Sequence, residues 1–164
     1  MTLSDAVSTR ISLRSYLPDP ISPQQVCQLN KAIAQYNRQA GLHIQLICNR
    51  PDPFSSLTKS YGMLTGVRNY LVFAGPESDP DLAEKCGYYG ELIILTATAM
   101  GLGTCWVGGT YDRRSCLCHL SEGEKLVCVA AIGHTPEERS GPEKLIRRIA
   151  QRSSKSVGEL ASGL

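Results

Sequence analysis

Three residues near the N-terminus are the first candidates for binding chemistry, because Arg10, Ser12 and Arg14 alternate along one polar segment. In an extended chain, residues at i, i+2 and i+4 face the same side. Two guanidinium groups that flank a hydroxyl would grip a phosphate, since arginine presents a fork of N–H donors to phosphate oxygens. A solvated N-terminal arm is the alternative interpretation, and three residues alone do not decide between the two.

A second basic segment lies near the other end of the chain, where four cations follow one another: Arg147, Arg148, Arg152 and Lys155. Such a segment could close over the same phosphate and complete the grip. A solvated helix face explains the same residues, and for Arg147 that interpretation is favoured.

The glycine-rich stretch GLGTCWVGGT, residues 101–110, brackets a short apolar strand with two glycine pairs. Glycine lets the backbone approach a ligand closely and leaves amide N–H groups facing it. The order differs from the dinucleotide fingerprint, because here the glycines follow a helix and precede a strand. A helix cap followed by a strand-end turn is the alternative. Spacing alone leaves the two interpretations even.

Catalysis by side chains finds little support, since the sequence contains no GxSxG elbow, no HExxH motif and no Walker lysine loop. The histidines occupy positions typical of solvated or capping roles. Glu91 is the only acid within the long apolar stretch, and we expect it to reach solvent at the helix start rather than to face a cavity. Cys116 and Cys118 with His119 match no common zinc pattern. We therefore predict neither a catalytic side chain nor a metal site.

Composition sets further limits on the function. The 164 residues favour a single domain over 1–164. A formal net charge of +2 argues against a broad nucleic-acid surface, which needs clustered cations. No apolar run approaches the roughly 20 residues of a membrane span, and none resembles a signal peptide. Seven cysteines in such a chain are expected to be reduced, which predicts a cytoplasmic protein.

The elements that must position these residues follow from the apolar pattern. Helices are predicted over residues 3–9, 22–41, 79–100, 112–119 and 142–152, and strands over 42–48, 69–74, 104–107 and 125–132. The helix that ends near Met100 is apolar almost all round, which is typical of a buried central element. Gly87 and Gly90 near its start predict a close-packed neighbour. Helices between strands indicate a layered α+β or α/β domain.

Taken together, these segments resemble the FMN-dependent nitroreductase family, in particular its compact, short-chain members. Residues 10–16 look like the opening motif R-x-S-x-R-x-[FY], and residues 90–109 look like the central helix and its glycine-flanked strand. Residues 129–138 resemble the following strand and turn, and residues 155–160 the closing basic motif. The resemblance therefore touches nearly the whole chain, in order.

The resemblance implies an α+β fold, a three-layer sandwich in which helices flank a central, mostly antiparallel sheet. It also implies an obligate homodimer, with two FMN sites at the interface built by both subunits. The expected partners are NAD(P)H, a small organic electron acceptor and a second copy of the chain, without nucleic acid or membrane.

The resemblance also assigns residues to one end of FMN. The phosphate end would be held by two segments: Arg10 and Ser12 from the first motif, and Arg152 and Lys155 from the tail. Ile11, between Arg10 and Ser12, is also expected to bind the cofactor. Arg14 would lie near the pyrimidine edge of the flavin. A cation there stabilises the anion of the reduced flavin and raises its reduction potential.

At the other end, the isoalloxazine ring would lie against Gly108 and Gly109, and a backbone N–H there would meet flavin N5. Val107, just before them, is also expected to bind the cofactor. Tyr61 and Gly62 occupy roughly the place where family members contact the flavin from another loop. The asparagine usual at that place in the family is not evident here.

The implied reaction is a ping-pong hydride transfer from NAD(P)H through flavin N5 to a nitroaromatic, a quinone or a similar acceptor. The flavin does this chemistry, and the protein supplies position and electrostatics. Two alternatives stay open. One is an FMN enzyme of another reaction, such as ene reduction, dehalogenation or flavin breakdown. The other is a flavin-binding sensor or storage protein without turnover.

Overall fold

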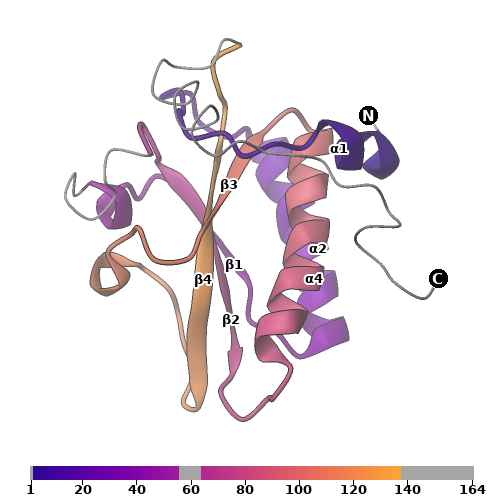
Figure 1. Ribbon diagram of the computed structural model, residues 1–164, viewed down its shortest axis with the longest axis vertical. Coiled ribbons are helices and arrows are strands. Elements are labelled where there is room, and N and C mark those ends of the chain that lie inside the picture. Colours follow the sequence, from indigo (N-terminus) through magenta and orange to yellow (C-terminus); the bar gives the residue numbers. More distant parts are fainter. Residues whose placement is uncertain (1, 56–63, 138–164) are drawn as a thin grey trace, which may run out of the picture.

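The computed structural model describes residues 2–55 and 64–137, and these form one mixed α+β unit (Figure 1). The helices are α1 (Leu3–Thr9), α2 (Pro23–Ala40) and α4 (Leu82–Ala99), and two 3-10 turns are η1 (Asp52–Phe54) and η2 (Arg113–Ser115). The strands are β1 (Gln45–Ile47), β2 (Asn69–Pro76), β3 (Gly103–Val107) and β4 (Glu124–Gly133). The predicted α+β class is confirmed. The helix predicted over 142–152 lies outside the described residues.

Local sequence signals set where the first two helices begin and end. Ser22 accepts a hydrogen bond from the Gln25 N–H, while the Gln25 side chain accepts one from the Ser22 N–H. This capping box satisfies two donors that a helix start leaves unpaired. Gly41 ends α2 in the left-handed conformation, with φ of 66°. Thr2 and Asp5 form the corresponding box at α1.

The four strands form one antiparallel sheet in the order β1-β2-β4-β3. The two long strands, β2 and β4, lie in the centre and pair over their whole length, from Asn69 opposite Ile132 to Pro76 opposite Glu124. The short strands β1 and β3 form the edges. The expectation of an antiparallel central sheet is therefore confirmed.

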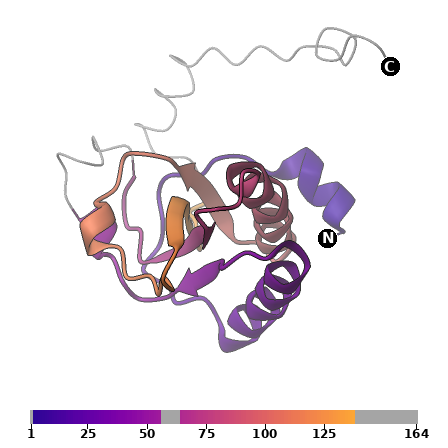
Figure 2. The same ribbon diagram turned by 90° about the horizontal axis from the view of Figure 1, so that it is seen from below.

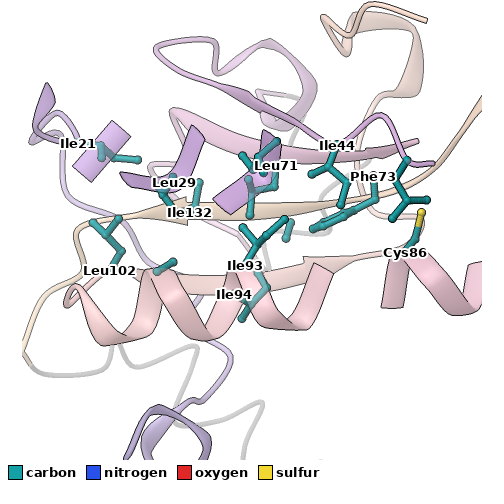
Figure 3. Close-up of a cluster of buried hydrophobic side chains, with 14 of the residues drawn as sticks. Ile21, Leu29, Ile44, Leu71, Phe73, Cys86, Ile93, Ile94, Leu102 and Ile132 are labelled. Carbon is teal, nitrogen blue, oxygen red and sulfur yellow. The ribbon is translucent and has the colours of Figure 1, made fainter. Parts of the chain in front are cut away.

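The two long helices, α2 and α4, pack on one face of this sheet (Figure 2). Between them and the strands lies the larger core, in which Ile93 and Ile94 of α4 face Leu71, Phe73 and Ile132 of the sheet (Figure 3).

The opposite face of the sheet buries a second core, which includes Tyr70, Val72 and Val129. Among the described residues it is covered by extended segments and the 3-10 turns, through side chains such as Phe54 and Tyr111. The layers are thus helices, sheet and a layer of turns and loops.

Helix α4 is the central element that its composition predicts, and it packs against α1, α2 and the sheet. No described helix is long and apolar enough to cross a membrane. The two glycines of α4 differ. A Cβ at Gly90 would lie 2.6 Å from Trp106 Cη2 and 2.7 Å from Phe73 Cε1, which confirms the predicted close packing. A Cβ at Gly87 would meet no atom within 4 Å, so the same prediction is wrong there.

Two predicted elements are shorter than expected. The strand predicted over 42–48 is formed only at 45–47. The His43 N–H still donates to the Ala74 carbonyl at 2.8 Å, while the Asn37 side chain binds the N–H and the C=O of Ile44, at 2.8 and 2.9 Å. The helix predicted over 112–119 is only the turn η2. Cys116 is already extended there, and the Cys118 N–H donates to the Cys116 carbonyl at 3.1 Å.

Candidate functional site

Residues 10–16, the N-terminal motif segment, run across the start of β3. Ser12 forms a parallel bridge with Thr104, and the Leu13 N–H donates to the Thr104 carbonyl at 2.9 Å. A side chain at Gly103 would collide with Thr135 and with Leu13, 3.0 Å from its Cδ1. Glycine at this position therefore lets the motif segment lie directly on the sheet.

The segment is fixed beyond the motif as well. The Thr65 N–H donates to the Arg14 carbonyl, and the Tyr16 N–H donates to the Thr65 carbonyl, both at 2.9 Å. The Leu17 N–H donates to the His134 carbonyl just after β4, also at 2.9 Å. Backbone hydrogen bonds thus hold the whole segment in one extended path.

Arg10 directs its guanidinium toward helix α4. Its Nε lies 3.4 Å from Glu91 Oε1, and its side chain is only 19% exposed. Both Nε and Nη2 are buried without a hydrogen-bond partner. Buried donors of a charged group are costly to leave unpaired. The side chain is therefore suited to an anion that would take up these donors.

Glu91 makes two contacts that sequence reasoning missed. Rather than reaching solvent alone, its carboxylate joins two elements: Oε1 lies by Arg10, and Oε2 accepts a hydrogen bond from Trp106 Nε1–H at 2.8 Å. Its place as the only acid in an apolar helix stretch was the available signal. The partners could not be read from the sequence, because they depend on how α4 packs on β3.

Gly108 and Gly109 follow the far end of β3, four and five residues beyond Thr104 and thus roughly 13–16 Å along the strand. A Cβ at either glycine would meet no atom within 4 Å, so their backbone borders open space. Val107 before them is buried. Ser12, which bridges Thr104, therefore lies near the start of β3, and the glycine pair follows its end. The Arg10 side chain instead reaches Glu91, whose other carboxylate oxygen binds Trp106 near that end.

The other predicted site residues have simpler positions. Ile11 is 39% exposed next to Arg10, whereas Ser12 and Arg14 are half-buried. Four of them lie outside the described residues: Tyr61, Gly62, Arg152 and Lys155.

An open cavity of about 410 Å³ begins where the motif segment ends. Its wall combines aromatic and aliphatic side chains with Ser55 and Arg68, and this mixed composition suits a small organic molecule. Its lining consists of Tyr16, Pro18, Pro51, Phe54, Ser55, Gly66, Val67 and Arg68.

Burial lowers the reactivity of three of the cysteines, none of which forms a disulfide. Burial raises the pKa of Cys116 and of Cys128 to about 11, and that of Cys86 to about 12, so these thiols are protonated at neutral pH. Within residues 2–55 and 64–137, no three His, Cys, Asp or Glu side chains are grouped so that they could hold a metal ion.

Comparison with known proteins decides the family. A family model described as "Putative TM nitroreductase" matches residues 2–163, nearly the whole chain. The chain belongs to the nitroreductase family. No curated protein matches it.

Solved structures share the nitroreductase fold at low sequence identity. A nitroreductase with bound FMN from Bacteroides fragilis has a TM-score of 0.68 at 14% identity, over 99% of this chain and 98% of its own. A nitroreductase family protein from Clostridium difficile has a TM-score of 0.68 at 16% identity, over 99% of this chain and 98% of its own. An FMN-dependent nitroreductase from another strain of that organism has a TM-score of 0.63 at 16% identity, over 92% of this chain and 98% of its own.

Proposed function

We propose that this nitroreductase-family protein is an FMN-dependent NAD(P)H oxidoreductase that reduces a nitroaromatic, a quinone or a similar small acceptor. The observation that carries the proposal is the Arg10 guanidinium: its Nε and Nη2 are buried without a hydrogen-bond partner, and Nε lies 3.4 Å from Glu91 Oε1. The family match and the FMN bound by a relative of the same fold support the choice of cofactor.

The residues present fit FMN at its phosphate end. A phosphate dianion would supply the acceptors that the buried Arg10 donors lack. We place Ser12 beside Arg10 at this end, and Arg152 and Lys155 as further cations. Ile11 would contact the cofactor from the same segment.

The residues present also fit FMN at its ring end, because a flat aromatic ring can approach the backbone closely only where no side chain projects. The open space at Gly108 and Gly109 would admit such a ring. We place a backbone N–H of this turn at flavin N5, with Val107, Tyr61 and Gly62 as further contacts.

When bound, FMN supplies the hydride chemistry that no side chain of this protein offers. Each residue then has a task of position or charge. Arg10 and Ser12 anchor the phosphate, and Arg14 places a positive charge at the pyrimidine edge. The glycine turn leaves one flavin face accessible to the nicotinamide and then to the acceptor. No side chain has to act as a nucleophile or as a general acid.

A homodimer is part of the proposal. Leu3, Val7 and Ile11 follow one another at four-residue spacing and are 46%, 64% and 39% exposed. Spacing of this kind places Leu3 and Val7 on one face of α1. This apolar stripe runs into Arg10, so a second copy that covers it would reach the proposed FMN site.

The first test is the visible absorption spectrum of the purified protein. We expect a yellow protein whose flavin bands bleach when NADH or NADPH is added without oxygen. A yellow protein that does not bleach would favour flavin binding without turnover. A colourless protein that ignores added FMN would refute the proposal. Turnover with a nitroarene, a quinone and an enone would then identify the acceptor class.

The site assignment has its own test. Replacing both Arg10 and Arg14 with alanine should remove FMN retention, because the phosphate and the pyrimidine edge each lose a cation. The matched control is Arg38→Ala, which removes an exposed arginine in the last turn of α2. FMN affinity would be measured by titration of flavin fluorescence, with circular dichroism as the check on folding. An unchanged FMN affinity in the double variant would refute the assignment.

A further inference from the structure

We infer that Glu91 is a positioning residue for flavin phosphate: it holds Arg10 so that the terminal guanidinium donors face the phosphate. The inference rests on the proposed function and extends it to a residue on α4. Glu91 need not touch the cofactor, because its action passes through Arg10.

The geometry divides the two carboxylate oxygens of Glu91 between two partners. Oε2 is held at 2.8 Å by the indole N–H of Trp106, and Oε1 lies 3.4 Å from Arg10 Nε. The carboxylate thus connects β3 with the residue that follows α1. Because one oxygen is anchored on β3, the position of the other is defined by the packing of α4 on the sheet.

That packing depends on Gly90, the residue before Glu91. Without a Cβ at Gly90, the Trp106 ring can lie against α4 and on Phe73, with the two ring centroids 4.4 Å apart. The indole N–H then falls within reach of the next side chain along the helix. Gly90, Trp106 and Glu91 therefore form one unit, the Glu91 bracket.

The charge of the bracket explains why Arg10 stays buried. A guanidinium that is 19% exposed and lacks any counter-charge would be expensive to keep out of water. Glu91 offsets this cost from the Nε side. Nη2 is buried without a hydrogen-bond partner, and a phosphate oxygen placed beside it would satisfy this donor. Glu91 thus orients the arginine before the phosphate arrives, and such preorganisation increases affinity.

An opposite effect is physically possible, and it gives the inference its sharpest test. A carboxylate beside Arg10 also repels a phosphate, so Glu91 could mask the arginine instead of positioning it. Positioning predicts weaker FMN binding when the charge is removed, whereas masking predicts tighter binding.

The experiment compares FMN with riboflavin, which lacks the phosphate, in the wild type and in Glu91→Gln. Glutamine keeps an oxygen that can accept the Trp106 hydrogen bond but loses the charge that attracts Arg10. We expect the dissociation constant for FMN to rise about tenfold, while that for riboflavin stays within about twofold. An unchanged or lower dissociation constant for FMN would overturn the inference.

Glu84→Gln is the matched control, because it removes the same charge from an exposed position two turns earlier on α4. It should leave both dissociation constants unchanged. Trp106 is the only tryptophan of the chain, so its emission reports directly on the bracket. The emission maximum should be the same in Glu91→Gln as in the wild type.

Two further variants separate the possible failures. Arg10→Ala should abolish the preference for FMN over riboflavin. If it does and Glu91→Gln does not weaken FMN binding, only the inference fails. If Arg10→Ala keeps the preference, or if no flavin binds, the proposed site and the inference fail together. Should Glu91→Gln not fold, Glu91→Asp replaces it: its shorter carboxylate cannot span both partners, and an unchanged FMN preference there would also overturn the inference.

Discussion

At the scale of single residues, the environments of the cysteines predict their reactivity. Cys27 is exposed on α2, whereas burial raises the pKa of Cys116 and Cys128 from 9.0 to about 11. At pH 7.5 this lowers their thiolate fraction about a hundredfold. We therefore expect iodoacetamide to alkylate Cys27 first in the native protein, as peptide mass mapping would show. Alkylation of Cys116 should accelerate as the pH rises toward 11.

Denatured protein is the control for that prediction, because unfolding removes the burial and should make the three thiols react alike. Equal rates for Cys27 and Cys116 in the native protein at pH 7.5 would contradict it.

The residue scale also shows how far sequence reasoning reaches. The spacing of Arg10, Ser12 and Arg14 can be read directly from the sequence, because an alternating motif is local. The partner of Arg10 cannot, since Glu91 lies some eighty positions later and meets it only through the contact of α1 and α4. The separation of the motif from Gly108 along β3 likewise depends on the strand pairing.

At the scale of elements, the two glycines of α4 predict opposite effects on stability. Gly90→Ala forces a methyl group against Trp106 and Phe73, and such overpacking costs about 1–3 kcal/mol. Gly87→Ala places its methyl group in open space and should raise the free energy of unfolding by about 0.5–1 kcal/mol through helix propensity. Urea unfolding followed by circular dichroism would measure both. Equal effects of the two substitutions would contradict this account of α4.

The elements differ in how well their ends could be predicted. The start and end of α2 follow from Ser22, Pro23 and Gly41, which act on their own neighbours. The surroundings of β1 do not follow in this way, because the bonds between Asn37 and the backbone of Ile44 depend on how α2 packs against the strand. Apolar periodicity carries no record of such a contact.

At the scale of the whole molecule, the apolar stripe Leu3, Val7 and Ile11 predicts how two copies meet. Val7→Glu would bury a charge in the proposed interface, so we expect the dimer dissociation constant to rise by roughly tenfold or more, and FMN binding to weaken with it. Sedimentation velocity over a range of concentrations measures this. Ser8→Glu adds the same charge to a neighbouring exposed position of α1 and should sediment like the wild type. Unchanged sedimentation of Val7→Glu would contradict the interface.

The two edge strands of the sheet disfavour one kind of association, the edge-to-edge pairing of strands from two copies of the chain. β1 has three residues and β3 has five, so each edge offers only a short row of backbone groups. The Gln45 side chain of β1 is engaged with the backbone of His119, and Leu13 binds β3 at Thr104. Short edges, of which β3 is also covered by the segment of Leu13, resist the strand-by-strand growth that leads to fibrils. Within residues 2–55 and 64–137, the sheet therefore offers little template for the addition of a strand from another copy.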